Sequence, residues 1–298
     1  MRALATCIAL ALISVTAACY DAGDVDDCLG NSCPFFGFQK PWGGELNIEY
    51  IAQVDGTDLT RVSAHFLESQ TPAYLPMMQP GACTDFFATG AWPLGQADER
   101  VYRDLGESLS VSTGDIEFVV PRQVATEDMP VTDYLFRTHD IAYLMRNPPG
   151  VADPGIFDAH WSVNLTEDVD FAPQLKDAIY MAPRYEVLSP TDFTHQFDPT
   201  QDYQITWKML GEPDPGPVIG VIFIIVSLEG SSVAGITGCL GINNGSMTVP
   251  KEVIQSLPSR NGLLQFGLAT DEPILTPEGQ LIHLMAQNCI QRLWQKTE

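Results

Sequence analysis

Basic residues are scarce in this chain. Lysine and arginine together number 15 against 38 aspartates and glutamates, which gives a formal net charge of −23 over 298 residues. Such a surface repels the phosphates of nucleic acid, so we expect no nucleic-acid partner. The acidic excess favours a hydrated, soluble surface over a specific cation-binding one.

Apolar runs long enough to cross a membrane as a helix are also missing. The densest run is Val218–Leu228, which is rich in β-branched and aromatic residues. A transmembrane helix needs roughly 20 apolar residues, and this run is far too short. A central strand covered on both faces fits it better. Hydrophobic residues make up 45% of the chain, so a sizeable core can form around such a strand.

The sequence has no strong catalytic or cofactor motif. It lacks a Gly-x-Ser-x-Gly nucleophile elbow, a His-Glu-x-x-His zinc motif and a phosphate-binding glycine loop. Asp168-x-Asp170, after Glu167, lacks the glycine and the terminal glutamate of an EF-hand, so a solvated loop is preferred over a calcium site. We therefore predict no catalytic residue, no metal and no cofactor, and we expect that the protein is not an enzyme.

The five histidines are dispersed along the chain. Only His139-Asp140 and Asp158-x-His160 place an imidazole close to a carboxylate in the sequence. Either pair could belong to a site, but a surface or hydrogen-bonded histidine is the commoner explanation. The histidines therefore predict no metal centre.

The N-terminus has the features of a secretion signal. Met1-Arg2 supplies a positive charge, Ala3–Val15 is apolar, and Thr16-Ala17-Ala18 precedes Cys19. This step resembles a bacterial lipoprotein lipobox, with Thr16 where leucine or valine is usual. The resemblance implies that residues 1–18 are removed and that Cys19 is acylated. The alternative is an ordinary secretory signal cut after Ala18 or nearby, which leaves Cys19 free.

An acidic tether is expected over residues 19–43. Tyr20, rather than aspartate, follows Cys19, so the default expectation is a lipid anchor in the outer membrane. Cys28 and Cys33 lie C-x4-C apart, and outside the cytoplasm such a pair is more often a small disulfide loop than a metal site. The remaining disulfide candidates are Cys83, Cys239 and Cys289, and with Cys19 acylated the number is odd.

Alternating polar and apolar residues predict strands through the rest of the chain. Glu45–Ile51 has the pattern of a half-buried strand. Ser108–Ser112 and Ile116–Val120 flank Gly114-Asp115 and predict a hairpin.

The C-terminal part carries further strand and turn signals. Ile236–Ile242 and Ser246–Val249 flank an Asn-Gly step that suits a type I′ hairpin turn. Pro250 is well placed to start a short helix over Lys251–Leu257. The apolar spacing of Gln280–Trp294 suits a strand or a helix.

These patterns predict an all-β protein, an antiparallel β-sandwich of the immunoglobulin or jelly-roll kind, with long loops and a short helix after Pro250. The sandwich is expected over residues 44–298, either as one region or as two halves, 44–184 and 185–298.

Several segments recur in the same order elsewhere and carry a resemblance to a β-sandwich module of uncharacterised, myxobacterial-type predicted lipoproteins. The clearest of them lie in the last third of the region of similarity, Glu45–Ala269: Tyr185–Pro190, Tyr203–Trp207, Cys239, Asn244–Pro250 and Leu257-Pro258. Gly81–Cys83 and Asp104–Gly106 are similar to its first half, with Leu105 in place of a small residue. The resemblance implies a secreted β-sandwich and brings no activity or functional residue with it.

The sequence thus favours a lipid-anchored envelope lipoprotein with a non-catalytic β-sandwich in a binding or structural role. Its expected partner is the membrane, through the lipid anchor, while a protein or glycan partner is left unidentified. The alternative is an extracellular carbohydrate-binding or carbohydrate-hydrolysing protein. For that alternative Trp92, Trp161 and Trp207 could form a stacking platform, although Trp207 lies in phase with core positions.

Overall fold

The computed structural model describes residues 42–68, 81–85, 102–114, 116–124, 141–146, 156–165, 171, 175–215, 219–230 and 232–297. Strands dominate these residues, with one short α-helix among them, α3 (Lys251–Ser256), so the all-β prediction and the helix after Pro250 are confirmed. The expected signal segment, Cys19, Cys28 and Cys33 lie outside the described residues.

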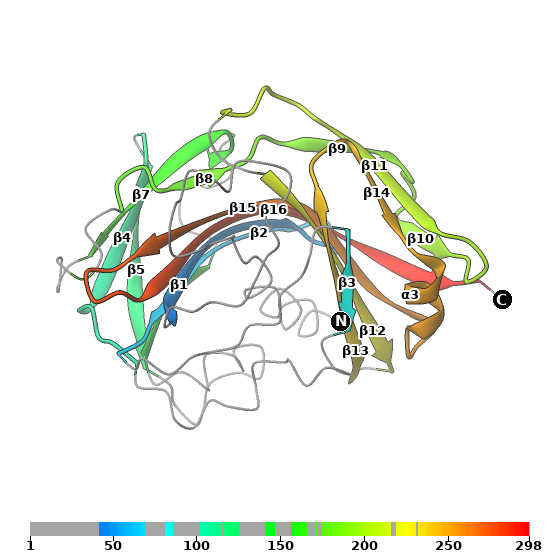
Figure 1. The fold of residues 1–298 in the computed structure, drawn as a ribbon, viewed down its shortest axis with the longest axis horizontal. Coiled ribbons are helices and arrows are strands. Elements are labelled where there is room, and N and C mark those ends of the chain that lie inside the picture. Colours follow the sequence, from blue (N-terminus) through cyan, green and yellow to red (C-terminus); the bar gives the residue numbers. More distant parts are fainter. Residues whose placement is uncertain are drawn as a thin grey trace.

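A large curved sheet of 13 strands arches across the molecule (Figure 1). Its main path runs in the order β3-β13-β12-β15-β16-β1-β2-β6-β5-β4-β7-β8, and β10 pairs with β16 outside that path. The strands are β1 (Trp42–Ala52), β2 (Asp58–Phe66), β3 (Cys83–Asp85), β4 (Ser108–Thr113), β5 (Ile116–Val124), β6 (Ile141–Arg146), β7 (Ala159–Leu165), β8 (Ile179–Met181), β10 (Thr194–Phe197), β12 (Ile219–Glu229), β13 (Ser232–Ile242), β15 (Asn261–Leu275) and β16 (Leu281–Lys296).

A smaller sheet packs over one end of the large one. It contains β9 (Tyr185–Ser189), β11 (Tyr203–Met209) and β14 (Ser246–Val249) in the order β14-β11-β9, and lies at the upper right of Figure 1. Its apolar face meets β12, β15 and α3 in a core that includes Trp207, Phe223 and Phe266. This face-to-face packing of two sheets gives the sandwich its first half.

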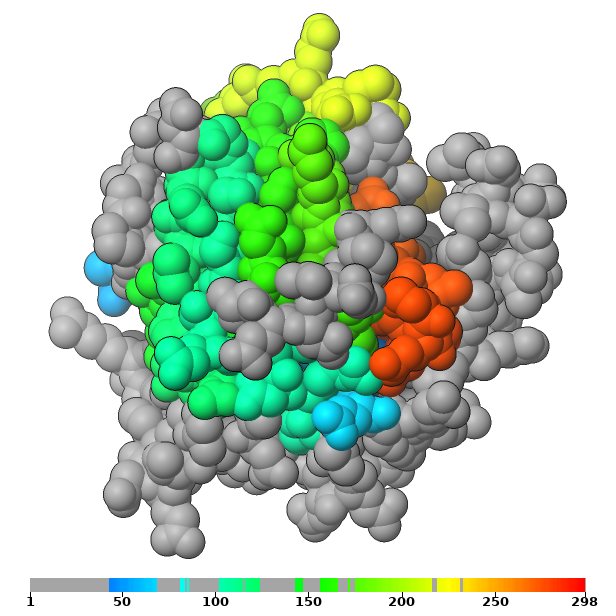
Figure 2. Space-filling view, turned by 90° about the vertical axis from the view of Figure 1, so that its left-hand side faces the viewer, coloured from blue at the N-terminus to red at the C-terminus, as the bar shows by residue number. Residues whose placement is uncertain are grey.

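The second half forms where the large sheet curls back over itself. Side chains of β4, β5, β7 and β8 pack against β1, β2 and β16 in a separate core, which contains Ile48, Phe118 and Trp161. Figure 2 shows the outer side of this half, with the neighbouring β4, β5 and β7 in teal and green beside the orange turn between β15 and β16. β16 contributes side chains to both cores and so links the two halves.

Strand β12 is central, as the sequence predicts for this run. It pairs with β13 on one side and β15 on the other, and its side chains from Val221 to Ser227 are buried on both faces. Ile222 and Ile224 pack into one cluster, while Phe223 and Ile225 pack into another on the opposite face. The alternation of a strand therefore places this apolar run in two cores at once.

The pairing in the sheets is mixed. All pairs among the described strands are antiparallel except β1–β16 and β10–β16, which are parallel. The hairpin of β4 and β5 around Gly114 is confirmed. The stretch Gln280–Trp294, which was ambiguous in the sequence, forms the long strand β16. The last strand thus lies beside the first one in the middle of the large sheet.

The predicted hairpin between residues 236–242 and 246–249 is wrong. β13 pairs with β12 and β3, whereas β14 pairs with β11 in the smaller sheet, so the Asn-Gly step carries the chain from one sheet to the other. A type I′ turn needs positive φ at both central residues. Gly245 has a φ of 89°, but Asn244 is not among the described residues with positive φ. The turn therefore does not fold the two strands onto each other.

The prediction that Glu45–Ile51 is half-buried is also wrong, because β1 is covered on both faces. Ile48 lies in the core, while Glu45, Asn47 and Glu49 on the other face are 4%, 1% and 0% exposed. The carboxylate of Glu49 is tolerated on this buried face because it forms an ion pair with Arg61 on β2. A buried charge is tolerated when it is paired, so the polar positions of this strand face other protein groups instead of water.

Candidate functional site

A cavity of about 350 Å³ opens beside β16, and it is named here the β16 cavity. It lies where the strand paired with β16 changes from β1 to β10. β1 pairs with β16 as far as Ala52 opposite Ile290, and β10 begins with Thr194 opposite Leu293. Residues 291 and 292 of β16 therefore have no strand paired with them on that side. A cavity of this size is at the lower end of the range for small-molecule sites.

The walls of the β16 cavity come from both sheets. β9 and the residues after it supply Tyr185, Glu186, Val187, Pro190 and Thr191. Leu210 follows β11, and Ile290 lies on β16. Most of these side chains are apolar or aromatic, which is typical of ligand pockets. The hydroxyl of Tyr185 donates a hydrogen bond of 2.8 Å to the Phe266 carbonyl, which fixes this wall to the large sheet.

Arg292 is the basic residue that lines the cavity. It follows Gln291 at the break between β1 and β10, and its Nη1 donates to the Gln291 carbonyl at 2.9 Å. Its guanidinium lies 5.7 Å from the centre of the Phe193 ring. Glu186, an acidic residue of the wall, forms an exposed ion pair of 3.0 Å with Lys208. Glu186 and Arg292 therefore do not form an ion pair with each other, and each contacts a different residue.

His195, on β10, also lines the cavity and is held by Tyr203 of β11. The pKa of His195 is lowered to about 4, chiefly by burial and secondly by the charge of Arg292, while Asp192 opposes the change. Burial also raises the pKa of Tyr203, so its hydroxyl keeps a proton to donate. When the ring hydrogen of the neutral imidazole is on Nε2, Nδ1 accepts a hydrogen bond from the Tyr203 hydroxyl.

Sequence reasoning did not find this cavity. His195 is one of five dispersed histidines, and Arg292 lies in a tail whose secondary structure was ambiguous. The residues that line the cavity come from positions 185–195, 210 and 290–292. Their proximity depends on the parallel pairing of β10 with β16, for which no local spacing in the sequence gives a signal.

A second polar cluster surrounds His160, one of the two histidines that the sequence places near a carboxylate. Its Nε2 lies 2.9 Å from Asp214 Oδ2, and its Nδ1 lies 3.2 Å from the Asp177 carbonyl. Tyr180, opposite it on β8, donates to Asp158 at 2.6 Å. Both ring nitrogens of His160 thus have partners, which matches the expectation of a hydrogen-bonded histidine. His139, Asp140 and the Asp168–Asp170 motif lie outside the described residues.

The described tryptophans of the suggested sugar platform are buried. Trp161 is 1% exposed in one core and Trp207 is 3% exposed in the other. Neither ring is free to stack on a sugar from solvent. Trp92 lies outside the described residues, so the platform receives no support from this part of the chain.

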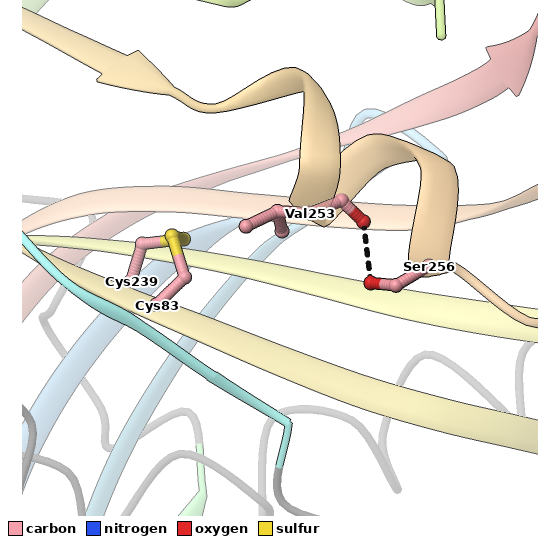
Figure 3. Close-up of a disulfide and its surroundings, with 4 residues drawn as sticks. All are labelled: Cys83, Cys239, Val253 and Ser256. Carbon is pink, nitrogen blue, oxygen red and sulfur yellow. Dashed lines mark hydrogen bonds between the residues drawn. A yellow bond between two sulfur atoms is a disulfide. The ribbon is translucent and has the colours of Figure 1, made fainter.

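Among the described cysteines, Cys83 and Cys239 form a disulfide that joins β3 to β13 (Figure 3). Val253 of α3 points toward the sulfur atoms, and both groups belong to the edge of the same core. Cys289, the third candidate in this part of the chain, is free and buried. Burial raises its pKa to about 12, so its thiol stays protonated and unreactive.

No other kind of site emerges from the part of the chain that the structure describes. None of its helices is long and apolar enough to cross a membrane. Its histidines, cysteines and carboxylates form no group of three or more that could hold a metal ion. No protein-family model matches the sequence, and no curated protein matches it either. The β16 cavity is therefore the candidate site that the geometry offers.

Proposed function

We propose that this protein is a lipid-anchored lipoprotein of the cell envelope whose β-sandwich acts by binding and not by catalysis. In this proposal residues 1–18 direct export, and Cys19 carries the lipid that holds the protein at the outer membrane. The resemblance to myxobacterial-type predicted lipoproteins belongs to the same proposal. The β16 cavity is the site where the folded region would bind its ligand.

The observation that carries the proposal is the disulfide between Cys83 and Cys239, which are 156 residues apart in the sequence. Structural disulfides form and persist in oxidising compartments and are rare in the reducing cytoplasm. A structural disulfide is therefore what an exported chain is expected to contain. It agrees with the apolar segment and the small residues before Cys19, which are themselves typical of an export signal.

The architecture around the cavity supports a binding role. Its walls lie on or next to β9, β10, β11 and β16, whose backbones are fixed by pairing in two sheets. A site built on strands holds its side chains in place before a ligand arrives, which lowers the entropic cost of binding.

The test is membrane fractionation of two matched variants, Cys19→Ser and Cys7→Ser. Both remove a thiol from the N-terminal segment, but only Cys19 is the proposed acylation site. Two acyl signals hold a protein firmly on a membrane, and a diacylglyceryl group together with amine acylation would supply them. Cys19→Ser should move the protein to the soluble fraction, while Cys7→Ser should leave it in the membrane. Unchanged membrane association of Cys19→Ser would refute the anchor.

A further inference from the structure

Arg292 has no acidic partner among the described residues, although the chain is rich in acids. Acidic residues outnumber basic ones by 38 to 15, yet no described carboxylate forms an ion pair with this guanidinium. Arg61, Arg103 and Arg122, by contrast, each pair with a carboxylate. Arginine presents a planar fork of donors that matches a carboxylate, and its other donors are left for a ligand in the β16 cavity.

Two further donors accompany Arg292 in the wall. In the tautomer of His195 that accepts from the Tyr203 hydroxyl at Nδ1, the ring hydrogen is on Nε2, and no described residue bonds to that nitrogen. Thr191 contributes a hydroxyl to the same cavity. Arg292 lowers the pKa of His195 by more than Asp192 raises it, so the positive charge of Arg292 acts on this imidazole more strongly than the nearby carboxylate does. A guanidinium, an imidazole N–H and a hydroxyl together suit a negatively charged oxygen ligand.

The rest of the wall limits the charge and the polarity of that ligand. Val187, Leu210 and Ile290 offer apolar surface. Arg292 supplies a single positive charge, and Glu186 lies in the same wall. A dianion would keep one charge uncompensated beside this carboxylate, which is costly in a partly desolvated site. A ligand with one negative charge and an apolar part matches both the Arg292 side and the apolar side of the cavity.

We propose that the β16 cavity binds a small monocarboxylate with a short apolar tail. The carboxylate lies against Arg292, with Thr191 and His195 as additional donors, and the tail lies along Val187, Leu210 and Ile290. A cavity of about 350 Å³ is at the small end of the range for ligand sites, and a chain of about six carbons fits in it. The inference rests on the proposed binding role and names the chemical class of its ligand.

Equilibrium dialysis of the full chain in detergent, with radiolabelled hexanoate as the probe, tests the inference. Saturable binding is expected, and unlabelled hexanoate should displace the probe. Hexanamide, which has the same tail without the charge, and inorganic phosphate should both displace it at least tenfold less well. Equal displacement by hexanamide would show a merely apolar cavity, and stronger displacement by phosphate would show an oxyanion site. Either result, or the absence of saturable binding, overturns the proposal.

Matched variants locate the binding. Arg292→Gln removes the charge in the cavity and should weaken hexanoate binding at least tenfold, whereas Lys251→Gln makes the same charge change at an exposed position outside the cavity and should change it less than twofold. A thermal unfolding curve of each variant shows whether it is folded, and Arg292→Lys, which keeps the charge without the fork, should give an intermediate affinity. Unaltered binding by folded Arg292→Gln contradicts the inference. These outcomes are separate from membrane fractionation, so the ligand can fail while the anchor stands.

Discussion

Arg61 of β2 and Glu49 of β1 lie opposite each other in the large sheet and form an ion pair in which both side chains are 0% exposed. Burial raises the pKa of Glu49, and the positive charge of Arg61 opposes that rise. A buried charge without its partner is far less stable than the pair.

Removing one member of this pair should therefore destabilise the fold strongly. We expect Glu49→Gln and Arg61→Met each to lower the free energy of unfolding by about 3–5 kcal/mol, and the double variant to lose less than the sum of the two. Denaturant unfolding of the purified protein measures this. Glu186→Gln, which breaks the exposed pair with Lys208, is the control and should cost less than about 1 kcal/mol. Losses that simply add in the double variant would mean that the two side chains are not coupled.

Truncation of β12 should be costly because this strand is buried on both faces. Ile222 and Ile224 are 0% and 1% exposed, so replacing either with alanine should cost about 2–5 kcal/mol through lost burial and a residual cavity. Ile242→Ala on the neighbouring β13 is a matched control, because that side chain is 63% exposed and should lose less than about 0.5 kcal/mol. Thermal or denaturant unfolding decides the matter. If both core substitutions leave stability unaltered, β12 is not in the core.

Peptide mapping under non-reducing conditions should recover Cys83 linked to Cys239 and Cys289 as a free thiol. Replacing Cys83 and Cys239 with alanine should cost about 2–5 kcal/mol, because the bond closes a long loop in the unfolded chain. The same map tests the pairing of Cys28 with Cys33, which remains a prediction from their spacing. Recovery of Cys239 bound to Cys28 or Cys33 would contradict both assignments.

Acid should weaken the fold through His195. Its pKa of about 4 in the folded protein lies below the ordinary 6.5, because burial and Arg292 disfavour the charged ring. Between these two values the unfolded chain binds a proton that the folded chain does not. The stabilisation is therefore complete above pH 6.5 and is lost as the pH falls to about 4, by up to about 3 kcal/mol.

Unfolding curves of the parent and of His195→Gln at several pH values isolate this effect, because the other titrating groups are common to both proteins. The difference in unfolding free energy should grow from pH 4 to pH 6.5 and then level off. Curves that run parallel over the whole range would show that His195 does not titrate as the structure indicates.

Single strands, turns and the short helix could be predicted from the sequence, because the residues that determine each of them are adjacent in the chain. Gly114 lies between two alternating runs and predicts the β4–β5 hairpin, and Pro250 starts α3. The run Val218–Leu228 is apolar at positions that face both sides of a strand, which predicts the central strand β12 without knowledge of its neighbours. In each case the residues that decide the structure are adjacent in the chain.

The sequence did not predict which strands and side chains pair across the sheets. Alternation in Glu45–Ile51 predicts a strand, but it does not reveal that Glu49 is buried and paired with Arg61. The Asn-Gly step indicates a turn without saying which sheet the next strand joins. The β16 cavity depends on a gap between two parallel neighbours of β16, so no pattern within one segment could predict Arg292 as part of a site. Acidic and amide side chains of β1 look exposed when the segment is read alone. Whether they are buried depends on which distant segments pack beside them.

The mass of the mature N-terminal peptide tests the lipid anchor most directly. The protein is extracted from membranes with detergent and digested, and its first peptide is sequenced by mass spectrometry. The account predicts a peptide that begins at Cys19 and carries the added mass of a diacylglyceryl group on its sulfur, with residues 1–18 missing. A mature chain that begins elsewhere, or an unmodified Cys19 thiol, would contradict it.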